Sequence, residues 1–288
     1  MLKIVCISLI IALGVFLSTN LEIQKLTAAA PISISSGGYH TCALLDDGKI
    51  KCWGFNGYGQ LGHGDTYSKG DGAGEMGNNL AYVDLGINGT AKSISSGLYH
   101  TCALLNNGEV KCWGSGNKGQ LGQGTKNNIG DNPSEMGDNL QAISLGTSKT
   151  ATQISAGHSH TCALLNDGDV KCWGDGHDGR LGQGNASYIG LKPNQMGDNL
   201  SPINLGANLK ATSISAGGDH TCALLNNGQV KCWGANNFGQ LGIGSTVSKG
   251  SSSTDMGDNL GNVDLGTGLT AKSISVGRYH SCAILDDN

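Results

Sequence analysis

Hydrophobic and polar positions alternate along the chain in short runs, and these runs are separated by residues typical of turns. Between residues 83 and 114 these runs are VDL (83–85), AKSIS (91–95), HTCALL (100–105) and EVKCWG (109–114), with Gly, Asn and Ser between them. Alternation with a period of two, bounded by such residues, predicts β-strands rather than helices. We therefore expect about four short strands in each stretch of about 60 residues.

The pattern recurs with a constant period. His100 follows His40 by 60 residues, and the same step separates the cysteines, the tryptophans, and the GQLG or GRLG and MG[ND]NL motifs of successive copies. Four copies and the start of a fifth begin near residues 32, 92, 152, 212 and 272. Units of about 60 residues with about four antiparallel strands are typical of β-propeller blades. The sequence thus predicts an all-β fold, a propeller of four-stranded blades over residues 31–288.

The fifth copy stops in mid-hairpin. Asn288 occupies the place of Gly48 in the first copy, so no K-C-W-G run follows Cys282. We expect an incomplete or open propeller. It would be part of a longer gene product, or an open arc that associates with a second chain through its exposed edges.

The composition agrees with a fold of many short strands, and it limits the classes of partner that the protein can bind. The 288 residues include 48 Gly and 4 Pro, with 14% charged and 5% aromatic residues. Frequent glycine disfavours helices and suits short strands joined by turns. A net charge of −4 and a pI of about 6.0 leave no basic stripe for a phosphate backbone, so we do not expect nucleic acid as a partner.

The first 30 residues differ from the rest. Lys3 precedes the apolar run 4–17, and Ala28, Ala29 and Ala30 follow a polar stretch. This order predicts a secretory signal peptide or a retained N-terminal anchor over residues 1–30. We expect no other membrane segment, and a protein that is secreted, periplasmic or at the cell surface.

The repeated motif resembles that of a known family. The pattern G-x-x-H-[TS]-C-A-[LI]-L-x-[DN]-G-x-[VI]-K-C-W-G-x-[GN]-x-x-G-[QR]-L-G is similar to the repeats of the regulator of chromosome condensation family. It resembles most the cysteine-containing version in exported bacterial proteins. The resemblance implies a propeller, typically of seven blades. It also implies a range of functions, among them nucleotide exchange on a nuclear GTPase and inhibition of a β-lactamase by a secreted protein.

Each copy carries two cysteines ten residues apart in a predicted hairpin. In HTCALLDDGKIKCWG the residues Asp46, Asp47 and Gly48 suit a three-residue loop, which places Cys42 opposite Cys52. Three interpretations stay open: a disulfide, which export favours, a pair of free buried thiols, and a metal site that includes the nearby histidine. The favoured disulfides are Cys42–Cys52, Cys102–Cys112, Cys162–Cys172 and Cys222–Cys232, with Cys282 left unpaired.

The other recurring residues are interpreted as structural. The histidine that recurs once per copy is expected to form hydrogen bonds with backbone groups. The tryptophan that recurs once per copy is expected to pack between blades. The pairs of loop acids at 71 and 75 and at 131 and 135 do not recur as pairs in the third and fourth copies, so we expect no metal. No catalytic motif stands outside the repeat, and we expect neither a cofactor nor enzymatic activity.

Residues that differ among the copies are the candidates for function. They lie in long loops, which usually gather on one face of a propeller. We expect an exported, non-catalytic binding or scaffold protein that recognises a protein or an extracellular polymer. The alternatives are a guanine-nucleotide exchange factor, by family analogy, and a secreted enzyme inhibitor. The candidate binding residues are Tyr58, His63, Tyr67, His177, Arg180, Tyr188 and Phe238, with Phe55, Asp175, Asp178 and Arg278 also variable.

Overall fold

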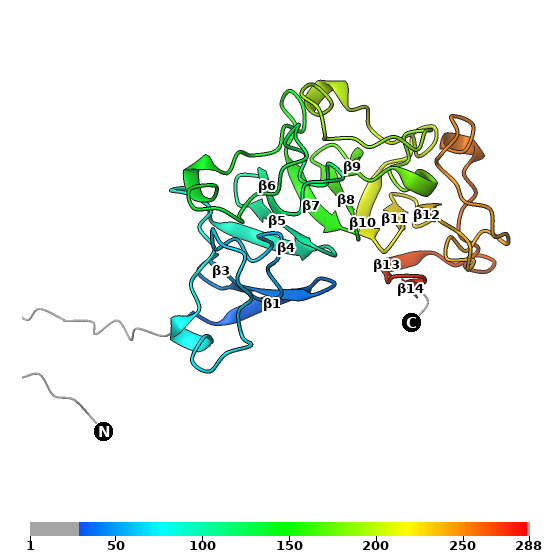
Figure 1. The fold of residues 1–288 in the computed structure, drawn as a ribbon. Helices are drawn as coiled ribbons and strands as arrows, with labels where there is room; N and C mark the ends of the chain where they lie inside the picture. Colours follow the sequence, from blue (N-terminus) through cyan, green and yellow to red (C-terminus); the bar gives the residue numbers. More distant parts are fainter. Residues whose placement is uncertain (1–28, 287–288) are drawn as a thin grey trace, which may run out of the picture.

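The computed structural model describes residues 29–286 and contains five small antiparallel sheets in chain order. Figure 1 shows these sheets fanned out, with β1 at one end of the fan and β14 at the other. The predicted all-β propeller fold is confirmed. Over the described residues the fan is open and does not close into a ring.

Every copy of the repeat contributes one sheet. The first sheet contains β1 (Pro31–Ser36), β2 (His40–Leu45) and β3 (Ile50–Gly54). The second contains β4 (Ala91–Ser96), β5 (His100–Leu105) and β6 (Val110–Gly114), and the third β7 (Ala151–Ala156), β8 (His160–Leu165) and β9 (Val170–Gly174). The fourth contains β10 (Ala211–Ala216), β11 (His220–Leu225) and β12 (Val230–Gly234), and the fifth β13 (Ala271–Val276) and β14 (Ser281–Leu285). Short 3-10 helices lie in the loops: η1 (Gly77–Asn79), η2 (Gly137–Asn139), η3 (His177–Gly179), η4 (Gly197–Asn199) and η5 (Gly257–Asn259). We call each sheet with its following loop a blade.

The hairpin between β2 and β3 has the register that the sequence predicts. Leu44 pairs with Ile50, and Cys42 pairs with Cys52. The backbone N–H of Leu45 donates to the carbonyl of Lys49 at 2.9 Å, and Gly48 has a φ of 77°. Glycine suits this loop because a side chain is disfavoured in the left-handed region.

The predicted fourth strand is reduced to a single hydrogen bond. The N–H of Val83 donates to the carbonyl of Ile50 in its own blade at 2.9 Å, whereas the carbonyl of Asp84 accepts from Gly137 of the next blade at 3.0 Å. Consecutive residues of the VDL segment thus bond to two different blades. The segment joins blades instead of extending one sheet, so the complete sheets have three strands.

The hydrophobic core lies between blades. Cys42, Leu44 and Ile50 of the first sheet pack with Leu105 and Trp113 of the second. The indole N–H of Trp113 donates to the carbonyl of Gln60 in the preceding blade at 3.0 Å. A blade of this type therefore completes its core only when another blade stacks on it.

Four of the five repeated histidines, His40, His100, His160 and His220, also join two blades. His40 Nε2 lies 2.7 Å from Thr101 Oγ1, and His160 Nε2 lies 2.9 Å from Thr221 Oγ1. The prediction that these rings bond backbone groups was wrong. The partner of each ring is a side-chain hydroxyl, which in turn bonds the main chain. For example, Thr221 Oγ1 donates to the carbonyl of Arg180 at 3.1 Å. Burial lowers the pKa of His40 to about 4, so its ring is neutral at pH 7.

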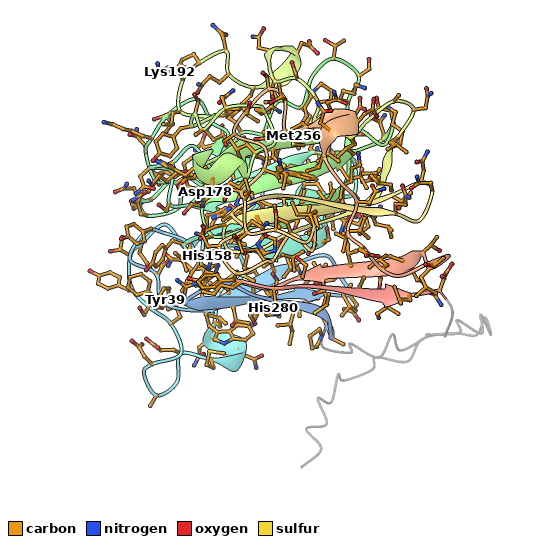
Figure 2. The ribbon with its side chains drawn as sticks, turned by 90° about the vertical axis from the view of Figure 1, so that its right-hand side faces the viewer. Tyr39, His158, Asp178, Lys192, Met256 and His280 are labelled. Atoms are coloured by element: carbon orange, nitrogen blue, oxygen red, sulfur yellow. A yellow bond between two sulfur atoms is a disulfide. The ribbon has the colours of Figure 1, made fainter. Side chains whose placement is uncertain are left out.

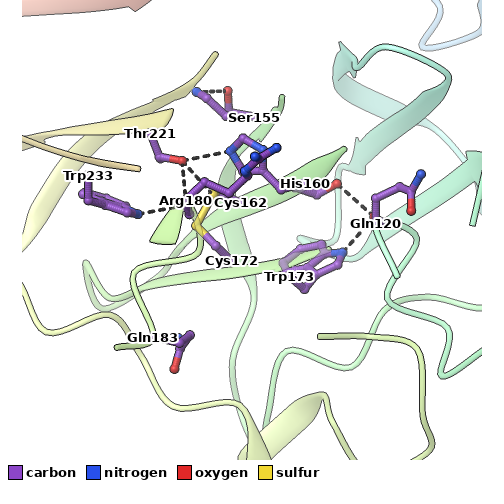
Figure 3. Close-up of a disulfide and its surroundings, with 12 residues drawn as sticks. Gln120, Ser155, His160, Cys162, Cys172, Trp173, Arg180, Gln183, Thr221 and Trp233 are labelled. Carbon is purple, nitrogen blue, oxygen red and sulfur yellow. Dashed lines mark hydrogen bonds between the residues drawn. A yellow bond between two sulfur atoms is a disulfide. The ribbon is translucent and has the colours of Figure 1, made fainter. Parts of the chain in front are cut away.

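The four cysteine pairs lie in the same interfaces. Their sulfur atoms are at disulfide-bonding distance, and the Cα atoms of every pair are 4.1 Å apart. In Figure 3 the Cys162–Cys172 bond lies beside His160 and Thr221, with Cys162 Sγ 3.9 Å from Thr221 Oγ1. Cys282 in β14 is exposed and has no disulfide partner among residues 29–286.

The predicted signal peptide or anchor lies almost entirely outside the described residues, which begin at residue 29. Over the part of the chain that is described, no helix has the length and apolar character needed to cross a membrane.

Candidate functional site

The turns between the first two strands of each sheet surround a common pocket. Its lining comes from all five sheets, through residues 36–38, 96–98, 156–158, 216–218 and 276–278, and its volume is about 220 Å³. Backbone hydrogen bonds join these turns, for example from Gly38 N to Gly97 O at 3.1 Å and from Leu98 N to His158 O at 3.1 Å. We call this hollow the axial pocket.

One position of the pocket wall must be glycine. A side chain at Gly97 would collide with the carbonyl oxygen of Gly157 and with the ring of His100, and its counterparts meet similar obstacles. The next position differs among the copies, and it forms the rim of the pocket. From the first to the fifth blade the rim residues are Gly38, Leu98, His158, Gly218 and Arg278.

A second ring of variable residues surrounds the rim. It consists of the residues that precede the repeated histidines, namely Tyr39, Tyr99, Ser159, Asp219 and Tyr279. The loops after the third strands are hydrogen-bonded to the backbone of this ring. Phe55 N donates to Tyr39 O, and Asp175 N donates to Ser159 O, both at 2.9 Å. We call the rim, this ring and these loops (55–60, 115–120, 175–180 and 235–240) the top face. Figure 2 shows Tyr39, His158 and Asp178 on the same side of the molecule.

Four aromatic side chains of the first two blades form a cluster on the top face. The rings of Tyr39 and Tyr99 are stacked, with centroids 5.1 Å apart and planes 2° apart. Tyr58 lies 4.9 Å from Tyr99, and Phe55 lies 6.2 Å from Tyr58. Tyr39, Phe55 and Tyr58 are exposed. The cluster therefore offers rigid aromatic area to a partner.

An ion-pair network occupies the third and fourth blades. Arg180 is buried, and its Nη1 lies 2.6 Å from Asp219 Oδ1 and 3.9 Å from Asp175 Oδ2. Lys118 Nζ lies 3.8 Å from Asp175 Oδ2 and donates to the hydroxyl of Tyr188 at 2.8 Å. Hydrogen bonds from the backbone and ring of His177, and the charge of Arg180, hold the pKa of Asp175 below its usual range although burial acts the other way.

At position 180 the main chain has a structural role, whereas the side chain differs among the copies. The carbonyl oxygen of Arg180 accepts bonds from Thr221 and Trp233, as Figure 3 shows, and the carbonyl oxygens of Gln60 and Gln120 do the same work in earlier blades. Because the main chain performs this function, the side chain is free to differ. Only the third copy carries arginine here.

His177 and Asp175 form a close pair, with Nδ1 and Oδ1 2.6 Å apart. The same carboxylate oxygen accepts the backbone N–H of His177 at 3.0 Å, so the pair belongs to a local turn. Among residues 29–286 no group of three or more His, Cys, Asp or Glu could hold a metal ion. The absence of catalysis and of a cofactor stays a prediction.

Comparisons with known proteins agree with this architecture. Residues 13–288 match the family described as RCC1-like domain. The chain belongs to the RCC1-like family. It is 30% identical over 258 residues to the E3 ubiquitin-protein ligase HERC2 of Homo sapiens, which covers 88% of this chain and 5% of that protein. It is also 30% identical over 275 residues to the ultraviolet-B receptor UVR8 of Arabidopsis thaliana, covering 78% of this chain and 58% of the receptor.

Solved structures share the fold. Yeast RCC1 (Prp20) bound to Kap60 superposes with a TM-score of 0.67 at 22% identity, over 89% of this chain and 54% of that one. The chain thus spans less than two thirds of these relatives' own lengths.

The structure brings most of the predicted binding residues of this RCC1-like chain onto the top face. Tyr58 belongs to the aromatic cluster, and His177, Arg180 and Tyr188 belong to the network, where the rings of His177 and Tyr188 lie 5.2 Å apart. Phe238 lies 5.1 Å from Tyr279. Two residues lie apart from these groups. His63 is half-buried, and its ring nitrogens have no hydrogen-bond partner in the described part of the chain. Tyr67 is exposed, and its ring lies near Lys69 Nζ.

Sequence reasoning missed several residues of the top face, namely Tyr39, Leu98, Tyr99, Lys118, His158, Asp219 and Tyr279. Tyr precedes the histidine in three of five copies, so it resembled a structural residue of the RCC1-like repeat. A position-by-position comparison of the copies would have found it, because Ser159 and Asp219 interrupt the series.

Proposed function

We propose that this chain is an exported, non-catalytic scaffold that binds a protein partner through its top face. One observation carries the proposal: the residues that vary among the copies surround the axial pocket. Of the ten Tyr and Phe residues in the chain, seven lie in the top face or contact it: Tyr39, Phe55, Tyr58, Tyr99, Tyr188, Phe238 and Tyr279. The blade interfaces use Leu, Ile, Val, Cys and Trp instead.

The chemistry of this face suits a protein partner. Tyrosines on short Gly-, Ser- and Asn-rich loops supply large contact area at a low cost in side-chain entropy. Tyrosine and arginine are also enriched among residues that dominate protein interfaces. The related yeast Prp20 forms a complex with Kap60, and it binds Gsp1p and histones. We favour a protein over an extracellular polymer for these reasons.

Export is supported by the N-terminal sequence and by the cysteine pairs. Four pairs at disulfide-bonding distance fit an oxidising compartment, because cytosolic thiols are kept reduced. We propose that residues 1–30 direct the chain out of the cytosol, and that residues 31–288 form the binding domain. The protein would then be secreted, periplasmic or at the cell surface.

We also propose self-association through the exposed face of the first sheet. Ile34 is 66% exposed, whereas its counterparts Ile154 and Ile214, which face a preceding blade, are 6% and 2% exposed. A second copy could cover this face as one blade covers the next. Light scattering on the purified full chain should then show a dimer that Ile34→Glu dissociates, and a monomer at all concentrations would count against the idea.

A matched pair of surface variants tests the main proposal. Tyr39→Ser with Tyr58→Ser removes half of the aromatic cluster, whereas Tyr82→Ser removes an exposed ring beside Lys49 and Lys51, at the opposite end of the strands. Cross-links between the exported full chain and its partner should map to the top face, and only the first variant should lose them. Cross-links that map elsewhere, or that both variants lose equally, would contradict the proposal.

Two alternatives remain separate proposals. A guanine-nucleotide exchange factor would accelerate nucleotide release from a GTPase, and a secreted inhibitor would reduce the turnover of an enzyme such as a β-lactamase. A nucleotide-release assay and an enzyme-inhibition assay, both with the full chain, test these two alternatives directly. Export disfavours the first, because its GTPase would be in the cytosol.

A further inference from the structure

The rim of the axial pocket carries one cation without a counter-ion. Arg278 is exposed, and it forms no ion pair with a carboxylate among residues 29–286. Its guanidinium carbon lies 4.9 Å from the centroid of the Tyr279 ring. This contact orients the side chain while its N–H donors stay free, since stacking uses the face of the guanidinium.

A second donor shares the rim. His158 lines the same pocket, it is half-buried, and its ring makes no hydrogen bond within the described part of the chain. Burial is the main cause that holds the pKa of His158 below its usual range; Asp219 opposes it, and Arg278 and Arg180 add to it. The ring is therefore neutral at pH 7, and it offers one N–H donor while Arg278 supplies the charge.

The neighbouring carboxylates are already paired. Asp219 lies in the next ring, and its Oδ1 is 2.6 Å from Arg180 Nη1. Asp178 and Asp175 lie 3.4 Å and 3.9 Å from the same guanidinium. These three acids share Arg180 and Lys118 as cations, so the group keeps a net charge of −1. None of them forms an ion pair with Arg278, and the cation at the rim is left for a ligand.

We propose that the axial pocket receives a carboxylate side chain of a protein partner, bound by Arg278 and His158. This inference rests on the proposed function of the top face. A charged hydrogen bond from arginine is stronger than a neutral one, and the planar guanidinium can bind both oxygens of a carboxylate. The pocket volume of about 220 Å³ admits a single side chain.

A protein carboxylate fits better than an acidic polysaccharide. A polyanion presents charges at regular spacing and is usually met by several cations. The rim has Gly38, Leu98, His158, Gly218 and Arg278, so it carries a single arginine. The tyrosines of the adjoining ring suit the neighbouring side chains of a polypeptide.

Peptide selection on the immobilised full chain tests the proposal. A random peptide display library should yield peptides with one recurring Asp or Glu. The affinity of the best peptide should fall at least about tenfold with Arg278→Gln, and by a similar factor when its acid is replaced by the amide. Lys192→Gln, which removes an exposed cation outside the pocket, is the control and should change nothing. His158→Phe should weaken binding less than Arg278→Gln, because it removes a donor but no charge. Unchanged melting temperatures would verify that the variants fold.

Several outcomes would overturn the proposal. They are selected peptides without an acid, an affinity that Arg278→Gln leaves unchanged, no selection above the bare support, or binding of dextran sulfate that Lys192→Gln weakens as much as Arg278→Gln. Peptides that depend on Tyr39 and Tyr58 but not on Arg278 would remove this inference and leave the proposed function standing. Peptides that depend on no residue of the top face would remove both.

Discussion

His160 and Thr221 lie in neighbouring blades, and a hydrogen bond of 2.9 Å joins His160 Nε2 to Thr221 Oγ1. Both side chains are fully buried. The threonine hydroxyl also contacts Cys162 Sγ and donates to the carbonyl of Arg180. One hydroxyl thus connects the histidine, the cysteine pair and the main chain at each junction between blades.

Removing that hydroxyl should weaken the junction. Thr221→Val keeps the shape of the side chain but leaves the buried ring of His160 and the carbonyl of Arg180 without this partner. We expect the free energy of unfolding to fall by about 1 to 3 kcal/mol. Chemical denaturation measures the change. Thr66→Val, at an exposed loop position, should stay within about 0.5 kcal/mol of the wild type, and equal losses in the two variants would contradict the assigned role.

The cysteine pairs should be oxidised in the exported protein. Non-reducing peptide mapping should recover Cys42–Cys52 and its three counterparts, and free thiols at these positions in freshly exported protein would disprove it. Replacing Cys162 and Cys172 by Ser should cost on the order of 2 to 3 kcal/mol, because the loop that the bond closes spans ten residues. Cys282→Ser is the matched control, and it should be nearly neutral because this thiol is exposed.

Acid should destabilise the protein through its buried histidines. Burial lowers the pKa of His40 to about 4 and is the larger cause that lowers the pKa of His100 to about 3, while the unfolded chain has a value near 6.5. Between these values the unfolded state binds more protons, so stability is present above pH 6.5 and is lost as the pH falls towards 4. We expect a loss on the order of 1 to 2 kcal/mol per buried histidine at pH 5.

Thermal unfolding between pH 7.5 and pH 4.5 measures this dependence. His100→Gln should lower stability at pH 7.5 and should flatten the profile, because it removes one titrating group. A profile with the same slope in wild type and variant would show that other groups cause the acid loss.

The network around Arg180 should serve recognition more than stability. Arg180→Gln restores the residue of the other complete copies but leaves Asp219 without its cation and Asp175 with Lys118 alone, so we expect a loss of about 1 to 3 kcal/mol. Adding Asp175→Ser and Asp219→Ser, the residues of the second and third copies at those places, should recover most of it. Denaturation of the single and triple variants tests this, and a triple variant less stable than the single one would assign a structural role to the network.

The sequence by itself determined the repeat, the strands and the hairpin register. These depend on contacts close along the chain. The alternating run 40–45, the loop 46–48 and the run 50–54 place Cys42 opposite Cys52 without help from another blade. The 60-residue period then specified a stack of similar units, because no single unit can bury its apolar face alone.

Only the tertiary structure decided how the copies meet. His40 bonds Thr101, which lies 61 residues later, and Tyr39 stacks on Tyr99 across the same junction. The VDL segment resembles a strand locally, but Val83 and Asp84 bond two different blades, so it does not extend one sheet. The axial pocket draws one turn from every sheet. Such contacts join residues that are remote in sequence, and the stacking geometry of the blades, which no local pattern encodes, decides which side chains face one another.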